Sequence, residues 1–333
     1  MTQDSKTESA GGVASAPLAL TVPDLAEAID FFTRRLGFRV DMIVPADAPQ
    51  TAIISGQGMT LRLETSGAQA SSSGSSLDLP EGARGFVISR SNEEWHVGRA
   101  GMQYRDLIPG RLGGHVVASH IRIPDGGETP DYVHYHKALF QMIYCRVGWA
   151  RVVYEDQGPS FTLEAGDCVL QPPEIRHRVL ESSPGLEVIE IGCPAAHETW
   201  ADHELELPTH EFLPERLFGG QRFVRHRARE ASWAPWRLAG FEARDTGIAA
   251  ATNGLAAARV VKSNLAIAAT ANAHAGELLF LFILQGELWV DSRVQENHQL
   301  QAGDSCVIPA GVDYTLRAGA GLEMLEVMIP EVN

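Results

Sequence analysis

Hydrophobic positions in this chain fall into short runs interrupted by Gly, Pro, Asp and Ser, and the first block of runs spans residues 17–64. Leu18–Val22 has the composition of a strand, and Pro23-Asp24 is a helix-start signal. Apolar residues then recur at helical spacing, at Leu25, Ala28, Ile29 and Phe32. Gly37 ends this predicted helix, and strand-like runs follow at Phe38–Val44, Thr51–Ile54 and Met59–Glu64. The block is therefore predicted to fold in the order βαβββ.

Beyond a Ser/Gly-rich linker at residues 67–80, the chain contains an internal repeat. Each copy is a series of short apolar strands separated by Gly, Pro and Asp, which is typical of an antiparallel barrel or sandwich. The matching segments are Tyr104-Arg105-Asp106 with Ala243-Arg244-Asp245, His134-Tyr135-His136 with Asn272-Ala273-His274, and Gly166-Asp167 with Gly303-Asp304. We predict a mainly β fold, in which residues 81–206 form one barrel, 207–240 a connector and 241–333 a second barrel.

Composition limits the classes of partner. The net charge of −15 would repel nucleic acid and anionic membranes. Residues 1–16 lack the basic and apolar segments of a signal peptide and are expected to form a disordered tail. No apolar run approaches the ~20 residues that span a bilayer. The four cysteines have no CxxC spacing, which favours free thiols and a cytoplasmic location.

Histidines carry the main chemical signal. His134 and His136 are two residues apart, so on a strand their imidazoles point to the same face. His177, on another predicted strand, offers a third imidazole. Three imidazoles would form a facial metal site with open positions for a reactant.

These motifs resemble those of the cupins. The family's first motif is a Gly, then His-x-His, a Glu and a further Gly, and the matching positions here are Gly127, His134, His136, Gln141 and Gly148. Its second motif, Gly-x5-Pro-x-Gly-x2-His, is matched by Gly166, Pro172, Glu174 and His177. The resemblance covers roughly residues 85–330. It implies two jelly-roll barrels, as in a bicupin, with one divalent metal ion held in the first by His134, His136, Gln141 and His177.

Two positions depart from the family pattern. Gln141 replaces the usual Glu, so the donor set is neutral and leaves the charge of a divalent metal uncompensated. Such a centre favours an anionic, chelating substrate such as an enolate, a diketonate or a hydroxy acid. Gln141 would bind the metal through its carbonyl oxygen or orient a metal-bound water, and both remain open. Glu174 replaces a Gly and is interpreted as a loop carboxylate, with an acid/base role as the alternative.

The second repeat retains one of the four ligand positions. Its equivalents are Asn272, His274, Leu279 and Tyr314. A single imidazole beside Leu279 does not hold a metal competitively, so the second barrel is interpreted as a structural partner or as a residual ligand pocket.

Other candidate site residues follow from strand alternation. Ile143 and Cys145 are expected to share the face of Gln141, and Val179 and Glu181 the face of His177. Candidates for a catalytic acid or base are Tyr144, Tyr154, Glu174 and Glu181. Arg176 and Arg178 are expected to point outward. Packing roles are favoured for His115 and His120, and no site role is assigned to His197, His203, His210 and His226.

The leading functional hypothesis is a mononuclear non-haem Fe(II) dioxygenase, for which three-histidine cupins are the precedent. The alternatives are a Lewis-acid isomerase or lyase using Zn, Mn or Ni, and a non-catalytic cupin that binds a small molecule. The first block resembles one module of the vicinal oxygen chelate (glyoxalase) superfamily through Val22-Pro23-Asp24, Phe31-Phe32 and Leu36-Gly37-Phe38. Because such modules normally work in pairs, we interpret it as a structural or dimerising module and expect a homodimer.

Overall fold

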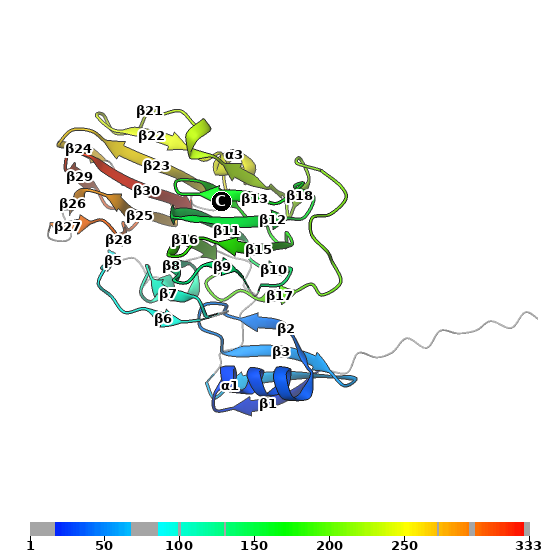
Figure 1. Ribbon diagram of the computed structural model, residues 1–333. Helices are drawn as coiled ribbons and strands as arrows, with labels where there is room; N and C mark the ends of the chain where they lie inside the picture. Colours follow the sequence, from blue (N-terminus) through cyan, green and yellow to red (C-terminus); the bar gives the residue numbers. More distant parts are fainter. Residues whose placement is uncertain are drawn as a thin grey trace, which may run out of the picture.

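The computed structural model of the chain describes residues 17–67, 86–98, 101–129, 131–271, 273–292 and 297–329. The expected tail at residues 1–16, nearly all of the expected linker at 67–80 and Asn272 lie outside these ranges. The described part is built mainly from β-strands, which form several sheets stacked above a small block that contains the longest helix (Figure 1).

The N-terminal block has the predicted βαβββ order. Its elements are β1 (Leu18–Val22), α1 (Leu25–Asp30), a π-helical turn η1 (Phe31–Arg35), β2 (Arg39–Val44), β3 (Thr51–Gly56) and β4 (Met59–Thr65). The Asp24 carboxylate caps the helix by accepting a hydrogen bond from the Glu27 amide at 2.9 Å. Gly37 follows the helical segment with a φ of +72°, a conformation that glycine adopts without strain. The likeness of this block to a glyoxalase module stays a prediction.

The first barrel consists of two facing sheets. One contains β9 (Gly127–Glu128), β10 (His134–His136), β12 (Trp149–Tyr154), β13 (Phe161–Glu164), β15 (His177–Ser182) and β17 (Thr199–Ala201). The other contains β6 (His96–Val97), β7 (Gln103–Asp106), β8 (Val117–Ile123), β11 (Phe140–Val147), β14 (Cys168–Leu170), β16 (Leu186–Cys193) and β20 (Val224–His226). A short helical segment, α2 (Arg111–Gly114), precedes β8.

The second barrel repeats this two-sheet arrangement. Its larger sheet contains β5 (Val87–Ser89), β21 (Ala234–Pro235), β22 (Glu242–Asp245), β23 (Ala257–Ser263), β25 (Leu278–Gln285), β28 (Ser305–Val307) and β30 (Leu322–Ile329). Its smaller sheet contains β24 (Ile267–Ala271), β26 (Glu287–Ser292), β27 (His298–Gln301) and β29 (Tyr314–Ala318). The remaining elements are a small hairpin and two short helical segments, β18 (Leu217–Phe218), β19 (Gln221–Arg222), η4 (Ala228–Glu230) and α3 (Ile248–Ala251).

The two barrels share strands and a core. Strand β5, which lies inside the range predicted for the first barrel, pairs with β28 of the second, and β20 of the expected connector pairs with β14 of the first. The sheet that contains β11 in the first barrel and the sheet that contains β25 in the second face each other across a buried cluster, with Phe140 and Tyr144 on one side and Phe280 and Phe282 on the other. The barrels are therefore joined by a continuous hydrophobic interface.

The N-terminal block extends the sheet that carries the histidines. Strand β2 pairs with β17, which in turn pairs with β10, so one sheet runs from the N-terminal block into the first barrel (Figure 1). This arrangement covers the edge of β17, whose backbone groups would otherwise be open to solvent.

All four cysteines are buried in the described structure, and none is in a disulfide. Among the residues that the structure describes, no helix is both long enough and apolar enough to cross a bilayer.

Candidate metal centre

Three histidines meet inside the first barrel. His134 on β10 lies directly opposite His177 on β15 in the antiparallel register, and His136 lies two residues farther along β10. One ring nitrogen of each histidine lies within 4.8 Å of those of the other two. The three residues are 3–8% exposed. The structure thus brings together the three imidazoles that the sequence motifs predict.

The hydrogen bonds behind these rings determine which nitrogen carries the proton. His134 Nδ1 lies 2.8 Å from the Tyr132 carbonyl oxygen, and His177 Nδ1 lies 3.0 Å from that of Ile175. A carbonyl oxygen only accepts, so Nδ1 must be the protonated nitrogen and Nε2 carries the lone pair. His136 Nδ1 has the Thr199 hydroxyl oxygen as its partner, at 2.9 Å.

This donor set fits a divalent metal ion. Metal-binding histidines normally donate their second ring N–H to an oxygen acceptor, which holds the ring in orientation and increases the basicity of the ligating nitrogen. Each of the three rings has such an oxygen behind it. His134, His136 and His177 are therefore the residues that would hold the metal.

Gln141 lies beside the triad but has a second contact. It is 2% exposed, lines the same cavity, and its Nε2 donates to Glu190 Oε1 at 2.7 Å. Its backbone carbonyl accepts from the Gln171 amide at 2.9 Å. The side chain of Gln141 is therefore held by a carboxylate that the sequence motifs do not include.

The cavity around these residues is small and largely apolar. Its volume is about 130 Å³. Aliphatic side chains form most of its wall, among them Val117, Ile121, Ile143, Val152 and Val188. No lysine or arginine is among its lining residues in the described part of the chain. A negative charge in this space would need a metal ion as its counter-charge, because an unpaired buried charge is costly.

Comparison with solved structures settles the fold. No family model and no curated protein sequence matches the chain. Salicylate 1,2-dioxygenase from Pseudaminobacter salicylatoxidans superposes with a TM-score of 0.54 at 15% identity, over 75% of this chain and 86% of that one. Oxalate decarboxylase from Lactobacillus farciminis superposes with a TM-score of 0.53 at 13% identity, over 74% and 86%. The chain has a cupin fold.

A third neighbour is Streptomyces albus HEPD, solved with 2-hydroxyethylphosphonate and Fe(II) bound, with a TM-score of 0.54 at 14% identity over 75% of this chain and 77% of that one. At such low identity the likeness shows the cupin fold and nothing about the substrate of this chain.

Two of the catalytic candidates are tyrosines, and only one of them lines the cavity. Tyr154 lines the cavity, stacks on the His177 ring and accepts a hydrogen bond from Gln171 Nε2 at 2.9 Å. Burial raises the pKa of Tyr154, so the phenol stays protonated at neutral pH. Tyr144 instead packs in the core between the two barrels, away from the cavity, and burial raises its pKa as well.

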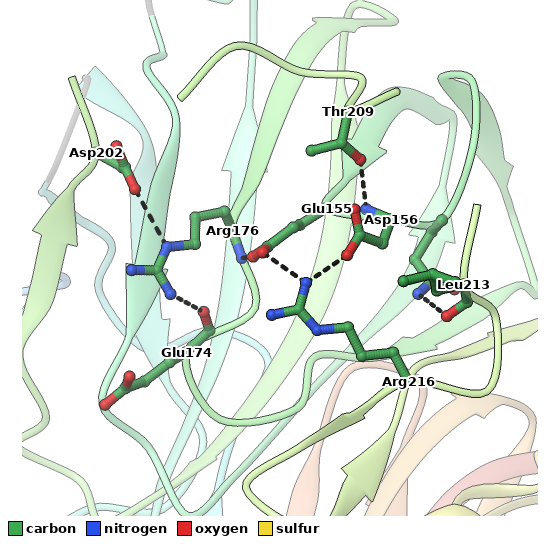
Figure 2. Close-up of polar contacts among 9 residues, drawn as sticks. Glu155, Asp156, Glu174, Arg176, Asp202, Thr209, Leu213 and Arg216 are labelled. Carbon is green, nitrogen blue, oxygen red and sulfur yellow. Dashed lines mark hydrogen bonds and ion pairs between the residues drawn. The ribbon is translucent and has the colours of Figure 1, made fainter. Parts of the chain in front are cut away.

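The two glutamate candidates lie outside the cavity lining. Glu174 is exposed and has a φ of +61°, which explains why the cupin motif favours glycine at this position. Figure 2 shows the Arg176 guanidinium bonded to Asp202 and to the Glu174 backbone carbonyl, while the Glu174 carboxylate points away from this cluster. Arg176 thus faces outward, as the alternation predicts.

Glu181 departs from the predicted alternation. Val179 lines the cavity, but Glu181 forms a partly exposed ion pair with Arg151 at 3.1 Å. Arg151 and Val152 are neighbours on β12, but their partners on β15 are Glu181 and Val179, which are two residues apart. Strand β15 therefore carries a bulge at this point. A bulge reverses the faces to which the following side chains point, and it removes Glu181 from the face of His177.

The structure adds several cavity residues that the motifs do not identify: Asp131, Gln171, Glu190 and His197. His197 is 7% exposed, and its ring centroid lies 5.4 Å from that of His136. Burial lowers its pKa, and its Nδ1 lies 2.8 Å from the Pro194 carbonyl, so the neutral ring is protonated at Nδ1. The sequence assigns no site role to His197, and the structure places it in the cavity lining.

His120 has the packing role favoured for it. It lies outside the cavity, where Arg105 Nη2 approaches its Nδ1 at 3.2 Å and its Nε2 lies 2.9 Å from Glu187 Oε2. Because arginine only donates, the neutral ring accepts at Nδ1 and donates to Glu187 at Nε2. The ring also contacts Phe282 and so links the two barrels.

The second cupin barrel has no comparable cluster among its described residues. Leu279 is 1% exposed and belongs to the apolar core that fills the barrel. His274 is held by a hydrogen bond to the Ile308 carbonyl at 2.8 Å. Tyr314, at the position of His177 in the repeat, accepts a hydrogen bond from Arg237 Nη1 at 2.8 Å. These contacts agree with a structural role for this barrel.

Proposed function

We propose that the chain is a metal-dependent cupin enzyme, and specifically a mononuclear non-haem Fe(II) dioxygenase that acts on a small anionic chelating substrate. The observation that carries the proposal is the set of three buried imidazoles on β10 and β15, each with an oxygen partner at Nδ1. The choice of iron is supported by the fold neighbours, one of which is a dioxygenase and another of which holds Fe(II).

The residues of the first barrel would act in distinct ways. His134, His136 and His177 hold the metal, which when bound would bring a chelating anion and dioxygen together at its open positions. Tyr154 is kept protonated by burial and accepts from Gln171, so its own O–H is a donor for a substrate oxygen. The aliphatic wall excludes water and strengthens these polar contacts.

The charge and size of the cavity restrict the substrate class. The described lining contains no lysine or arginine, so the two positive charges of the metal would have to balance both the substrate and the acidic side chains of the lining. The carboxylates of Asp131 and Glu190 already lie in the lining. We therefore favour a compact monoanion, such as a β-diketonate or a hydroxyketone enolate, over a dianion such as oxalate.

Oxygen uptake after anaerobic loading with Fe(II) tests this proposal. The assay would compare β-diketones and monoanionic hydroxyaromatic acids with oxalate, for the wild-type protein and for His177→Ala. The proposal predicts uptake with at least one monoanionic chelator, none with oxalate and none with His177→Ala. Absence of uptake with every chelating compound in an Fe(II)-loaded protein would contradict the dioxygenase assignment.

A Lewis-acid isomerase or lyase is the second candidate, and Glu190 favours it. This carboxylate lies in the cavity lining, where it could take a proton from a carbon next to a carbonyl group. Zn, Mn or Ni would serve for this chemistry, and dioxygen would not be required. Turnover of a hydroxyketone or hydroxy acid by Zn-loaded protein under strict anaerobiosis would select this function over the dioxygenase.

A further inference from the structure

The carboxylate that the cupin pattern places at position 141 is present in this chain on the neighbouring strand. Glu190 lies on β16 opposite Ile143 of β11, and its Oε1 accepts a hydrogen bond from Gln141 Nε2 at 2.7 Å. Both side chains line the cavity that contains the three histidines. A short contact between an amide N–H and a carboxylate is a charge-assisted hydrogen bond, which is stronger than a neutral one.

This contact fixes the orientation of the Gln141 amide. A carboxylate only accepts hydrogen bonds, so the amide must present its NH₂ group to Glu190. The carbonyl oxygen is then the end of the amide that does not bond to Glu190. If Gln141 faced a second amide instead, either end could form the contact and its orientation would be undetermined.

We infer that Glu190 is a positioning residue, which holds Gln141 so that its carbonyl oxygen serves as the fourth protein donor to the metal. This inference rests on the proposed metal site. In this inference, Glu190 supplies the negative charge that the cupin motif places at position 141.

The second barrel contains a matched arrangement without the histidine triad. Glu326 lies on β30 opposite Leu281 of β25, as Glu190 lies opposite Ile143, and it is 1% exposed. Its Oε2 is 2.7 Å from Arg237 Nη2, and the same guanidinium contacts Tyr314. Where the metal ligands have been lost, an arginine thus supplies the cation for this carboxylate.

Cobalt(II) is the probe for the test, because its visible absorption changes with the number and type of its ligands. The full-length wild-type protein would be titrated with Co(II) beside Glu190→Gln, the exchange variant Gln141→Glu/Glu190→Gln, and His177→Ala. Glu326→Gln is the matched control, since it alters the equivalent buried glutamate of the barrel that lacks the triad. Thermal unfolding of each variant would confirm that it is folded.

The inference predicts that Glu190→Gln weakens Co(II) binding about tenfold or more and shifts the absorption spectrum. Glu326→Gln should leave affinity and spectrum unchanged. The exchange variant should restore tight binding, because the amide at position 190 can donate to a carboxylate at position 141. An unchanged spectrum in folded Glu190→Gln would overturn the positioning role while leaving the metal site intact. Absence of Co(II) binding by the wild-type protein would instead overturn the proposed function, and this inference with it.

Discussion

The candidate site depends on residues that do not themselves reach the metal position. The Tyr132 and Ile175 carbonyls hold His134 and His177 from behind, and the Thr199 hydroxyl does the same for His136. Backbone carbonyls cannot be removed by mutation, whereas a side-chain hydroxyl can. Thr199 is therefore the position at which the orientation of a ring can be tested directly.

Thr199→Val should weaken metal binding about tenfold, because it removes the oxygen partner of His136 Nδ1 while retaining the shape of the side chain. Thr199→Ser keeps the hydroxyl and should retain near wild-type affinity. Calorimetric titration with Zn(II) would measure both. Equal affinities for the valine and serine variants would show that this hydrogen bond does not support the site.

Glu174→Gly should increase the free energy of unfolding by up to about 1 kcal/mol. A non-glycine residue in the left-handed region costs about 1–2 kcal/mol, and the added chain entropy of glycine offsets part of the gain. Glu174→Ala removes the carboxylate but keeps the backbone conformation, so its stability should match the wild-type protein. Urea unfolding would distinguish the two variants. A loss of turnover in both would contradict the placement of Glu174 outside the catalytic machinery.

The histidine triad could be predicted from sequence because strand alternation and motif spacing are local properties. Glu190 could not, because its position beside Gln141 depends on the register between β11 and β16. The sequence did contain a signal for Glu190, which is a charged residue between two isoleucines in an apolar run. The second repeat has a similar pattern around Glu326. His197 lies beyond both motifs and reaches the site through the chain that follows β16.

At the scale of elements, the predicted strands and helix of the N-terminal block are confirmed, since each depends on local pattern. The exchange of β5 and β20 between the barrels was not predictable, because pairing between distant segments leaves no local signature. The pairing of β2 with β17 is a second long-range contact of this kind. It gives the N-terminal block a structural role within the same chain, whereas its expected role in dimerisation stays a prediction.

Deletion of residues 1–66 should destabilise the first barrel, because it uncovers the edge of β17 next to the strand that carries His134 and His136. We expect the melting temperature to fall by several degrees, since 1 kcal/mol corresponds to roughly 2–4 °C for a domain of this size. Deletion of residues 1–16 alone is the control. Differential scanning calorimetry would compare the three proteins, and identical melting temperatures would show that the block is dispensable for stability.

At the scale of the whole molecule, the two barrels share an interface but have different residues in their interiors. The first contains the histidines, and the second is filled by an apolar core and an Arg237–Glu326 ion pair. The two barrels and their interface also bury titratable groups. Burial lowers the pKa of His120, His226 and His274, and contacts with His120 and Arg146 lower that of Glu187 to about 2.

Folding stability should therefore decrease in acid. Below about pH 6.5 the unfolded chain protonates histidines that stay neutral in the folded protein, so each of them lowers the free energy of unfolding as the pH falls toward its folded pKa. Glu187 adds a further loss between about pH 4.5 and 2. Urea unfolding at pH 7.5 and 5.5 should differ by on the order of 1 kcal/mol or more.

His226→Gln should reduce this difference, whereas His210→Gln, which alters an exposed histidine, should not. Equal stability of the wild-type protein at the two pH values would contradict the buried neutral state of these histidines.

Metal content tests the central claim most directly. The wild-type protein and His177→Ala would be incubated anaerobically with Fe(II), desalted and analysed by inductively coupled plasma mass spectrometry. The account predicts one metal ion per chain in the wild-type protein and none in His177→Ala, because two imidazoles from a single strand do not complete the site. A metal-free wild-type protein, or equal metal in both, would contradict it.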